Sequence, residues 1–193
     1  MTVRIYVAFG LCALMLGACG SGGGETTTTG SVVETPQALP KLPPGWRPVV
    51  NAGEGFAFGL PPGWQARETR SGTSLLRTAD RRIAVSISAD RTDQALNQPL
   101  GDYAAGAAKS LGGLSRIKIL GTEEIRDRYS AVEVRASGVA KGGVKEQAVL
   151  VGLRRDHLAT FVVASLRRAS VPRALYGAQV TRIVKTLRSR PIE

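Results

Sequence analysis

Cysteine and histidine are almost absent from this sequence of 193 residues. The two cysteines, Cys12 and Cys19, both lie close to the N-terminus, and the single histidine is His157. Residues 20–193 therefore have no thiol for a disulfide and no thiolate ligand for zinc. One histidine also leaves no histidine cluster for a metal and no cysteine–histidine pair for nucleophilic catalysis. We predict no metal site and no cofactor.

Aromatic residues and acidic residues are also scarce. Phe, Trp and Tyr make up 5% of the chain, so aliphatic residues and alanine must fill the core. Lys and Arg number 26 against 15 Asp and Glu, which gives a formal net charge of +11. Such a charge favours an anionic partner, although an arginine-rich solvated surface is the plainer interpretation. No cluster of base-stacking aromatic residues supports a nucleic-acid partner.

Long apolar runs occur only at the N-terminus. Arg4 provides a positive charge, residues 5–16 are largely apolar, and the small residues Gly17 and Ala18 precede Cys19. This order is typical of a secretory signal peptide. A membrane-spanning helix needs about 20 apolar residues, and the run that ends at Cys19 is shorter. We therefore predict a cleaved signal rather than a transmembrane anchor.

The sequence Leu16-Gly17-Ala18-Cys19 resembles the cleavage box of bacterial lipoprotein signal peptides. The resemblance implies that the Cys19 sulfur receives a diacylglyceryl group and that the chain is cleaved between Ala18 and Cys19. Two or more acyl chains, such as palmitate, anchor a protein stably to a bilayer. The alternative is an ordinary secretory signal with an incidental Cys19. The expected location is the extracytoplasmic face of a bacterial cell membrane.

Glycine, threonine and proline dominate residues 20–44, and this composition does not form a packed core. A flexible coil of this length reaches about 25–30 Å. We divide the chain into a signal peptide (residues 1–18), the lipidated Cys19 with its tether (residues 19–44) and one domain (residues 45–193).

A five-residue motif occurs twice at the start of this domain. Leu42-Pro43-Pro44-Gly45-Trp46 recurs as Leu60-Pro61-Pro62-Gly63-Trp64. Proline followed by glycine is typical of a type II turn. We predict two turns that close one edge of the domain, each followed by a tryptophan that packs on the core.

Alternating apolar residues predict strands along most of the domain. Residues 158–164 are apolar in every position but one, so the strand that contains them is expected at the centre of the sheet. One further predicted strand contains Ile117 and Ile119, and Ile125 is a candidate for its continuation. The other predicted strands cover residues 56–58, 65–70, 73–78, 82–89, 131–140, 144–154 and 157–166.

Two segments have helical periodicity. Apolar residues in 100–111 lie on one helical stripe that ends at Gly112-Gly113. At the C-terminus, Ser170 is the predicted N-cap and Pro172 lies in the first turn. The C-terminal stripe consists of Tyr176, Val180, Ile183, Val184 and Leu187.

The predicted fold class is therefore α+β, with an antiparallel sheet of about 6–8 strands and two packed helices.

This order of elements resembles the PsbP-like superfamily. The supporting residues are 56–64, with their Phe-x-Phe strand and Pro-Pro-Gly-Trp turn, the strand 158–166 and the helix 176–187. The resemblance implies an α/β/α sandwich and mostly non-catalytic, protein-binding roles. No binding residue carries over, so neither photosystem nor Ran binding is implied.

Pairs of arginines fall at the predicted strand ends and turns. If several of these side chains share one edge of the domain, they form a rim that faces an anionic partner. The residues are Arg81, Arg82, Arg126, Arg128, Arg154, Arg155, Arg167 and Arg168.

The resulting expectation is a non-enzymatic, lipid-anchored binding or accessory module that contacts an envelope protein or an anionic polymer. One alternative is an envelope hydrolase of wall glycan that uses Glu123, Glu124 or Asp127. Adjacent strand residues point to opposite faces, so Glu123 and Glu124 would not converge. The other alternative is a carrier with an apolar pocket beside the helix 100–111, where small residues allow either close packing or a cavity.

Overall fold

The computed structural model describes residues 39–126, 130–155 and 159–190. The predicted signal peptide, Cys19 and most of the tether lie outside these ranges, as do Asp127, Arg128 and His157. The elements in chain order are β1 (Arg47–Asn51), β2 (Phe56–Leu60), β3 (Trp64–Glu68), β4 (Ser74–Thr78), β5 (Ile83–Asp90), α1 (Asp93–Asn97), α2 (Leu100–Lys109), β6 (Leu114–Arg126), β7 (Ser130–Ala140), β8 (Lys145–Arg155), β9 (Ala159–Arg168), α3 (Ala174–Thr186) and β10 (Arg188–Ser189).

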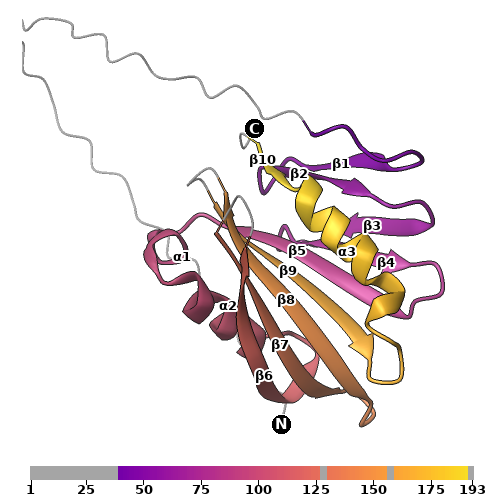
Figure 1. The fold of residues 1–193 in the computed structure, drawn as a ribbon, viewed down its shortest axis with the longest axis vertical. Helices are drawn as coiled ribbons and strands as arrows, with labels where there is room; N and C mark the ends of the chain where they lie inside the picture. The colour runs from indigo at the N-terminus through magenta and orange to yellow at the C-terminus, as the bar shows by residue number, and fades with distance from the viewer. Residues whose placement is uncertain (1–38, 127–129, 156–158, 191–193) are drawn as a thin grey trace, which may run out of the picture. The chain divides into compact units, whose positions relative to one another are not determined.

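The strands form two antiparallel sheets (Figure 1). The larger sheet has seven strands in the order β3-β4-β5-β9-β8-β7-β6, and the smaller has the order β1-β2-β10. Strand β9 lies at the centre of the larger sheet, as its apolar sequence predicts, and its first six residues are buried. The predicted α+β class and strand number are confirmed, whereas the separate three-stranded sheet was not expected.

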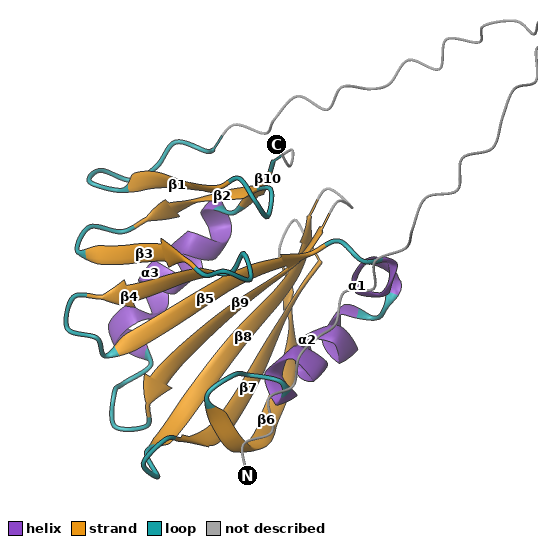
Figure 2. Ribbon diagram, turned by 180° about the vertical axis from the view of Figure 1, so that it is seen from behind, coloured by secondary structure: helices purple, strands orange, loops and turns teal. Residues whose placement is uncertain are grey.

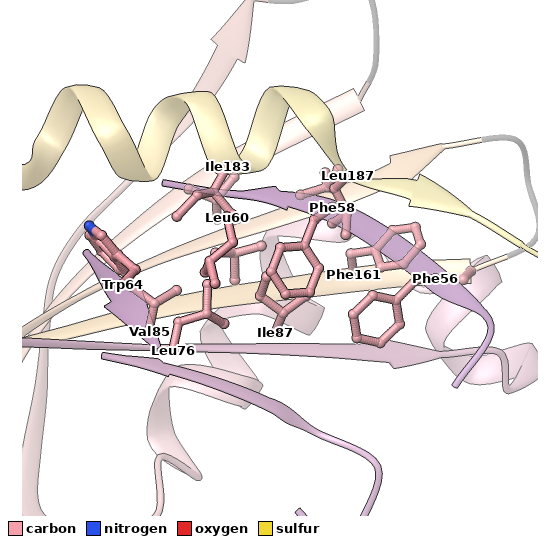
Figure 3. Close-up of a cluster of buried hydrophobic side chains, with 14 of the residues drawn as sticks. Phe56, Phe58, Leu60, Trp64, Leu76, Val85, Ile87, Phe161, Ile183 and Leu187 are labelled. Atoms are coloured by element: carbon pink, nitrogen blue, oxygen red, sulfur yellow. The ribbon is translucent and has the colours of Figure 1, made fainter. Parts of the chain in front are cut away.

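Helices cover opposite faces of the seven-stranded sheet (Figure 2). Helix α2 packs on β6, β7 and β8, and α3 packs on the other face, against β2 of the smaller sheet. Residue alternation along each strand divides the core accordingly, since Val132 and Val134 of β7 face α2 while Val85 and Ile87 of β5 face α3. Figure 3 shows the α3 side of this core, including Ile183 and Leu187 of the helix.

The repeated motif forms the two predicted turns. The backbone N–H of Trp46 donates to Pro43 O at 3.1 Å, and that of Trp64 donates to Pro61 O at 3.3 Å. Gly45 and Gly63 have φ angles of 76° and 74°, which are the left-handed values that a type II turn requires. Trp64 is buried and its indole Nε1 donates to Gln179 of α3, whereas Trp46 is only partly buried against the same core.

The N-cap prediction for the last helix was wrong. Helix α3 begins at Ala174 rather than near Ser170, and its N-cap residue Arg173 makes no side-chain cap. Ser170 lies in the turn after β9, where the N–H of Val171 donates to Arg168 O. Pro172 disfavours helical backbone at the residue before it, so the helix begins after the proline.

The short helix α1 was missed. It contains five residues and has one buried side chain, Ala95, so it presents no apolar period to detect. Thr92 is its N-cap and accepts a hydrogen bond from the Ala95 N–H.

Candidate functional site

A half-open groove of about 200 Å³ lies between α3 and the seven-stranded sheet. We call it the α3 groove. Its floor comes from strand residues whose side chains alternate toward α3, and its wall is one stripe of the helix. The floor consists of Ile83, Ile125, Ala131, Glu133, Val149, Val151, Leu153, Ser165 and Arg167, and the wall of Arg173, Gly177, Val180, Thr181, Val184 and Lys185.

The groove is amphipathic. Aliphatic side chains from four strands make up most of the floor, while Arg167, Arg173 and Lys185 supply positive charge at its margins. Glu133 is the single carboxylate among the lining residues. Such a surface suits a group that is apolar along its length and has a negative charge nearby.

Arg167 is held rigidly at the floor. Its guanidinium donates to Gln147 Oε1 and to the backbone oxygen of Val171. Partial burial, and then the nearby charge of Arg173, lower the pKa of Arg167. The guanidinium still carries its charge at neutral pH, because arginine titrates far above this range. A negative group in the groove would relieve the repulsion between the two arginines.

Arg173 forms a two-pronged ion pair with Glu133. The Nη2 atom of Arg173 lies 2.7 Å from each of the two carboxylate oxygens of Glu133, and the Glu133 side chain is 17% exposed. This pair joins the start of α3 to β7 across the groove. Neither residue was predicted from the sequence, although the alternation in β7 places Glu133 on the opposite face of the strand from its buried neighbours Val132 and Val134.

Asp80 fixes the start of α3 from the other side. Its carboxylate accepts hydrogen bonds from the Thr78 hydroxyl, the Tyr176 hydroxyl and the Arg82 N–H. These bonds, with Thr78 the largest contributor, lower the pKa of Asp80 to about 2. Hydrogen bonds to a carboxylate favour its ionised form.

We predict that this carboxylate makes folding pH-dependent at low pH. The folded pKa of about 2 is below the reference value of 3.8. The ionised carboxylate therefore stabilises the folded state above the higher value, and that contribution disappears as the pH falls through 2. Tyr176→Phe should move the Asp80 midpoint upward in an NMR titration, whereas Tyr103→Phe, at a distant hydroxyl, should leave it in place. An unchanged midpoint in Tyr176→Phe would contradict this account.

The structure separates the predicted arginine rim into two groups. Arg81 and Arg82 precede β5, and its first residue Ile83 pairs with Arg167 of β9, so these arginines and Arg168 lie at one end of the sheet. Arg126, Arg154 and Arg155 lie at the opposite end, where β7 begins and β8 ends. Arg128 lies outside the described residues.

Arg154 has a structural role. Its guanidinium donates to Thr160 Oγ1 and to the carbonyl oxygens of Ala95 and Gln98 at the end of α1. These bonds satisfy carbonyl groups that a helix end leaves without partners. Arg154 is therefore engaged within the fold rather than presented to a ligand.

The two described carboxylates that were considered for hydrolysis do not converge. Glu123 and Glu124 are successive residues of β6 and face opposite sides of the sheet, and Asp127 lies outside the described residues. Glu123 pairs in register with Glu133, which is bound by Arg173. Within the residues that the structure describes, no group of three or more carboxylate, histidine or cysteine side chains is placed to hold a metal ion.

Where α2 covers the sheet, close packing fills the place of the expected apolar pocket. A separate open hollow of about 280 Å³ lies past the end of this helix, lined by Leu111, Gly112 and strand residues that include Leu75 and Leu166. Helix α2 packs closely on the sheet, and a Cβ atom added at Gly152 would lie 3.0 Å from Ala104 Cβ. Small residues on both surfaces allow this close approach, and Ala104 and Ala108 are fully buried. The groove lies instead on the opposite face, under α3.

No helix in the described part of the chain is long and apolar enough to span a membrane.

Solved structures resemble this fold. A cyanobacterial PsbP (CyanoP) from Synechocystis has a TM-score of 0.54 and 11% identity, covering 75% of this chain and 92% of that one. The Ran-binding protein Mog1p of Saccharomyces cerevisiae has a TM-score of 0.51 and 10% identity, covering 75% and 95%. A Bacteroides thetaiotaomicron protein has a TM-score of 0.51 and 15% identity, covering 76% of this chain and 49% of that one.

These likenesses establish a PsbP-like fold, as the sequence resemblance implied. No protein-family model and no curated protein matches the sequence. At identities this low, shared architecture carries no shared function.

Proposed function

We propose that this chain is a lipid-anchored, non-enzymatic binding module at the extracytoplasmic face of a bacterial membrane, and that the α3 groove is its binding surface. The observation that carries the proposal is the amphipathic lining of the groove, with an aliphatic floor beside Arg167, Arg173 and Lys185. The partner that fits is an envelope component that presents an apolar group next to an acidic one.

The size of the groove favours docking over transport. Pockets that enclose a small-molecule ligand usually measure roughly 300–1,000 Å³, whereas the α3 groove measures about 200 Å³ and is open along one side. It can receive a side chain or a short chain segment of a larger partner. This supports an accessory module more than a carrier that encloses its cargo.

Site-specific cross-linking in cells tests this function. A photoreactive amino acid replaces Thr181, which lines the groove, or Ala178, which is exposed on α3 but does not line it. We expect capture of one defined envelope component from position 181 and not from position 178. Equal capture from both positions, or none from position 181, would show that the groove is not the binding surface.

Substitutions at Gly177 separate binding from folding. Gly177 lies within α3, lines the groove, and has open space where a Cβ would be. Gly177→Ala should stabilise the protein by about 1 kcal/mol through helix propensity and leave the groove open. Gly177→Trp should fill the groove and abolish cross-linking from position 181 without unfolding the protein.

The matched control is Gly106→Ala in α2, where the added Cβ also meets no neighbour. Urea unfolding should show a similar gain in stability, with cross-linking unchanged. Undiminished cross-linking in Gly177→Trp would place the partner elsewhere on the domain.

A further inference from the structure

Four loops gather at one end of the seven-stranded sheet. The turn before β5 lies beside the end of β9, because Ile83 pairs with Arg167. The end of β9 lies beside the start of β8, because Arg168 pairs with Glu146, and β6 starts opposite Ala140, the last residue of β7. Figure 2 shows the β4–β5, β7–β8 and β9–α3 connections on the same side of the sheet.

These loops are rich in positive charge. Among their described residues (79–82, 109–113, 141–145 and 168–173), Asp80 is the only carboxylate, and it is already bound by Tyr176 and lies near Arg82. Glu146, the first residue after the third loop, adds one more negative charge. We call this surface the basic end, defined by Arg81, Arg82, Lys109, Lys141, Lys145 and Arg168, all of them exposed.

Exposed apolar side chains lie among these cations. Val144, between Lys141 and Lys145 in the chain, is 38% exposed, and Leu175, in the first turn of α3, is 50% exposed. Both are among the few large hydrophobic side chains that are exposed in the described residues. Apolar side chains surrounded by lysine and arginine are typical of surfaces that contact the headgroup region of a bilayer.

The first turn of the domain also lies toward this end. The turn at Pro43–Trp46 precedes Arg47, which pairs with Leu60, and Gly45 lies against Pro62. The following strand starts at Trp64, opposite Thr78 at the end of β4. The turn that leads into β1 therefore lies on the side that carries Arg81 and Arg82.

We propose that the basic end docks on an anionic phospholipid surface and orients the domain on the membrane. The lysine and arginine side chains lie at the level of the phosphate groups, and Val144 and Leu175 contact the headgroup–acyl boundary. The inference rests on the proposed membrane anchoring and is independent of what occupies the α3 groove.

The test uses the full protein as purified from bacterial membranes, with Val144→Cys labelled by a fluorophore. It is placed in vesicles of phosphatidylcholine alone or with phosphatidylglycerol, each containing a quencher attached to the lipid acyl chain. We expect strong quenching only with phosphatidylglycerol, and its loss in about 0.5 M salt, where charges are screened within a few ångströms. The control is a label at Leu120→Cys, which is 54% exposed on edge strand β6 and should stay unquenched.

A charge-matched pair of variants identifies the surface. Lys141→Gln, Lys145→Gln and Arg168→Gln together should remove most of the quenching at position 144. Arg70→Gln, Lys118→Gln and Arg135→Gln together remove the same charge elsewhere on the exposed surface and should leave the quenching unchanged. Equal loss in both variants, or quenching that is independent of lipid charge, would overturn the proposal.

Flotation of the same vesicles tests the lipid anchor separately from docking by the basic end. Flotation with both lipid compositions reports the lipid anchor, and the quenching pattern then decides the orientation. Flotation with phosphatidylglycerol only would refute the anchor and still support the basic end if the 141/145/168 variant abolishes it. Absence of flotation with both compositions would overturn both proposals.

Discussion

Replacing Phe161 with alanine is expected to destabilise the domain by about 3–5 kcal/mol. Phe161 lies on the central strand β9, is fully buried, and its ring meets Phe56 edge-on with centroids 6.1 Å apart. The chain has four phenylalanines, and three of them, Phe56, Phe58 and Phe161, lie in this one cluster. Small domains are stable by only about 5–15 kcal/mol, so this single cavity removes a large part of the total.

Urea unfolding of the wild-type protein and Phe161→Ala measures the loss. The control is Leu175→Ala, which truncates a half-exposed side chain on α3 and should change the stability by less than about 0.5 kcal/mol. A loss below about 1 kcal/mol in Phe161→Ala would mean that the α3 side of the core does not have this packing.

Cys19→Ala is expected to release the protein from the membrane. The predicted anchor depends on this one sulfur, and each buried methylene of its acyl chains contributes about 0.8 kcal/mol to membrane binding. No other cysteine remains after cleavage at Ala18, because Cys12 lies in the removed segment. The domain itself should be unaffected, since Cys19 lies outside the described fold.

Two measurements check this prediction. The mature wild-type protein should have the mass of a chain that begins at an acylated Cys19 and should partition into the detergent phase, whereas Cys19→Ala should lose the acyl mass and this partitioning. Thermal unfolding should be the same for both proteins. Wild-type protein that begins at another residue, or carries no acyl group, would indicate an ordinary secretory signal.

The α3 groove shows why local sequence signals reach only part of a site. Val180 and Val184 belong to the predicted stripe of the last helix, so two of the six wall residues follow from helical periodicity. Arg173 and Glu133 are 40 positions apart and come together only because α3 lies across β7. No periodicity within either segment contains that information.

The positions of the arginine pairs follow from the sequence, but their neighbours in space do not. Their positions at strand ends follow from the turns that the sequence predicts, and the structure places all of the described ones there. Strand order decides which ends are neighbours, and it separates Arg154 from Arg167 by the length of β9. Arg154 also does not contribute to the predicted anion-facing rim, because its guanidinium is hydrogen-bonded to α1, a short helix whose sequence has no apolar periodicity.

The sequence by itself determined the order of the long strands and of both longer helices, the two Pro-Pro-Gly-Trp turns and the central position of β9. Each of these depends on residues close together in the chain, where a period of 2 or 3.6 and a favoured turn conformation act locally. The sequence is also the basis of the predicted lipid anchor at Cys19.

Tertiary structure alone decided the smaller sheet, the place of the groove and the basic end. Strand β10 has two residues, and it exists because Arg188 and Ser189 pair with β2 across more than half of the chain. The groove opened under α3 rather than α2 because small side chains at Gly152 and Ala104 let α2 pack closely. Pairing partners and packing distances are properties of the assembled sheet, so no single segment encodes them.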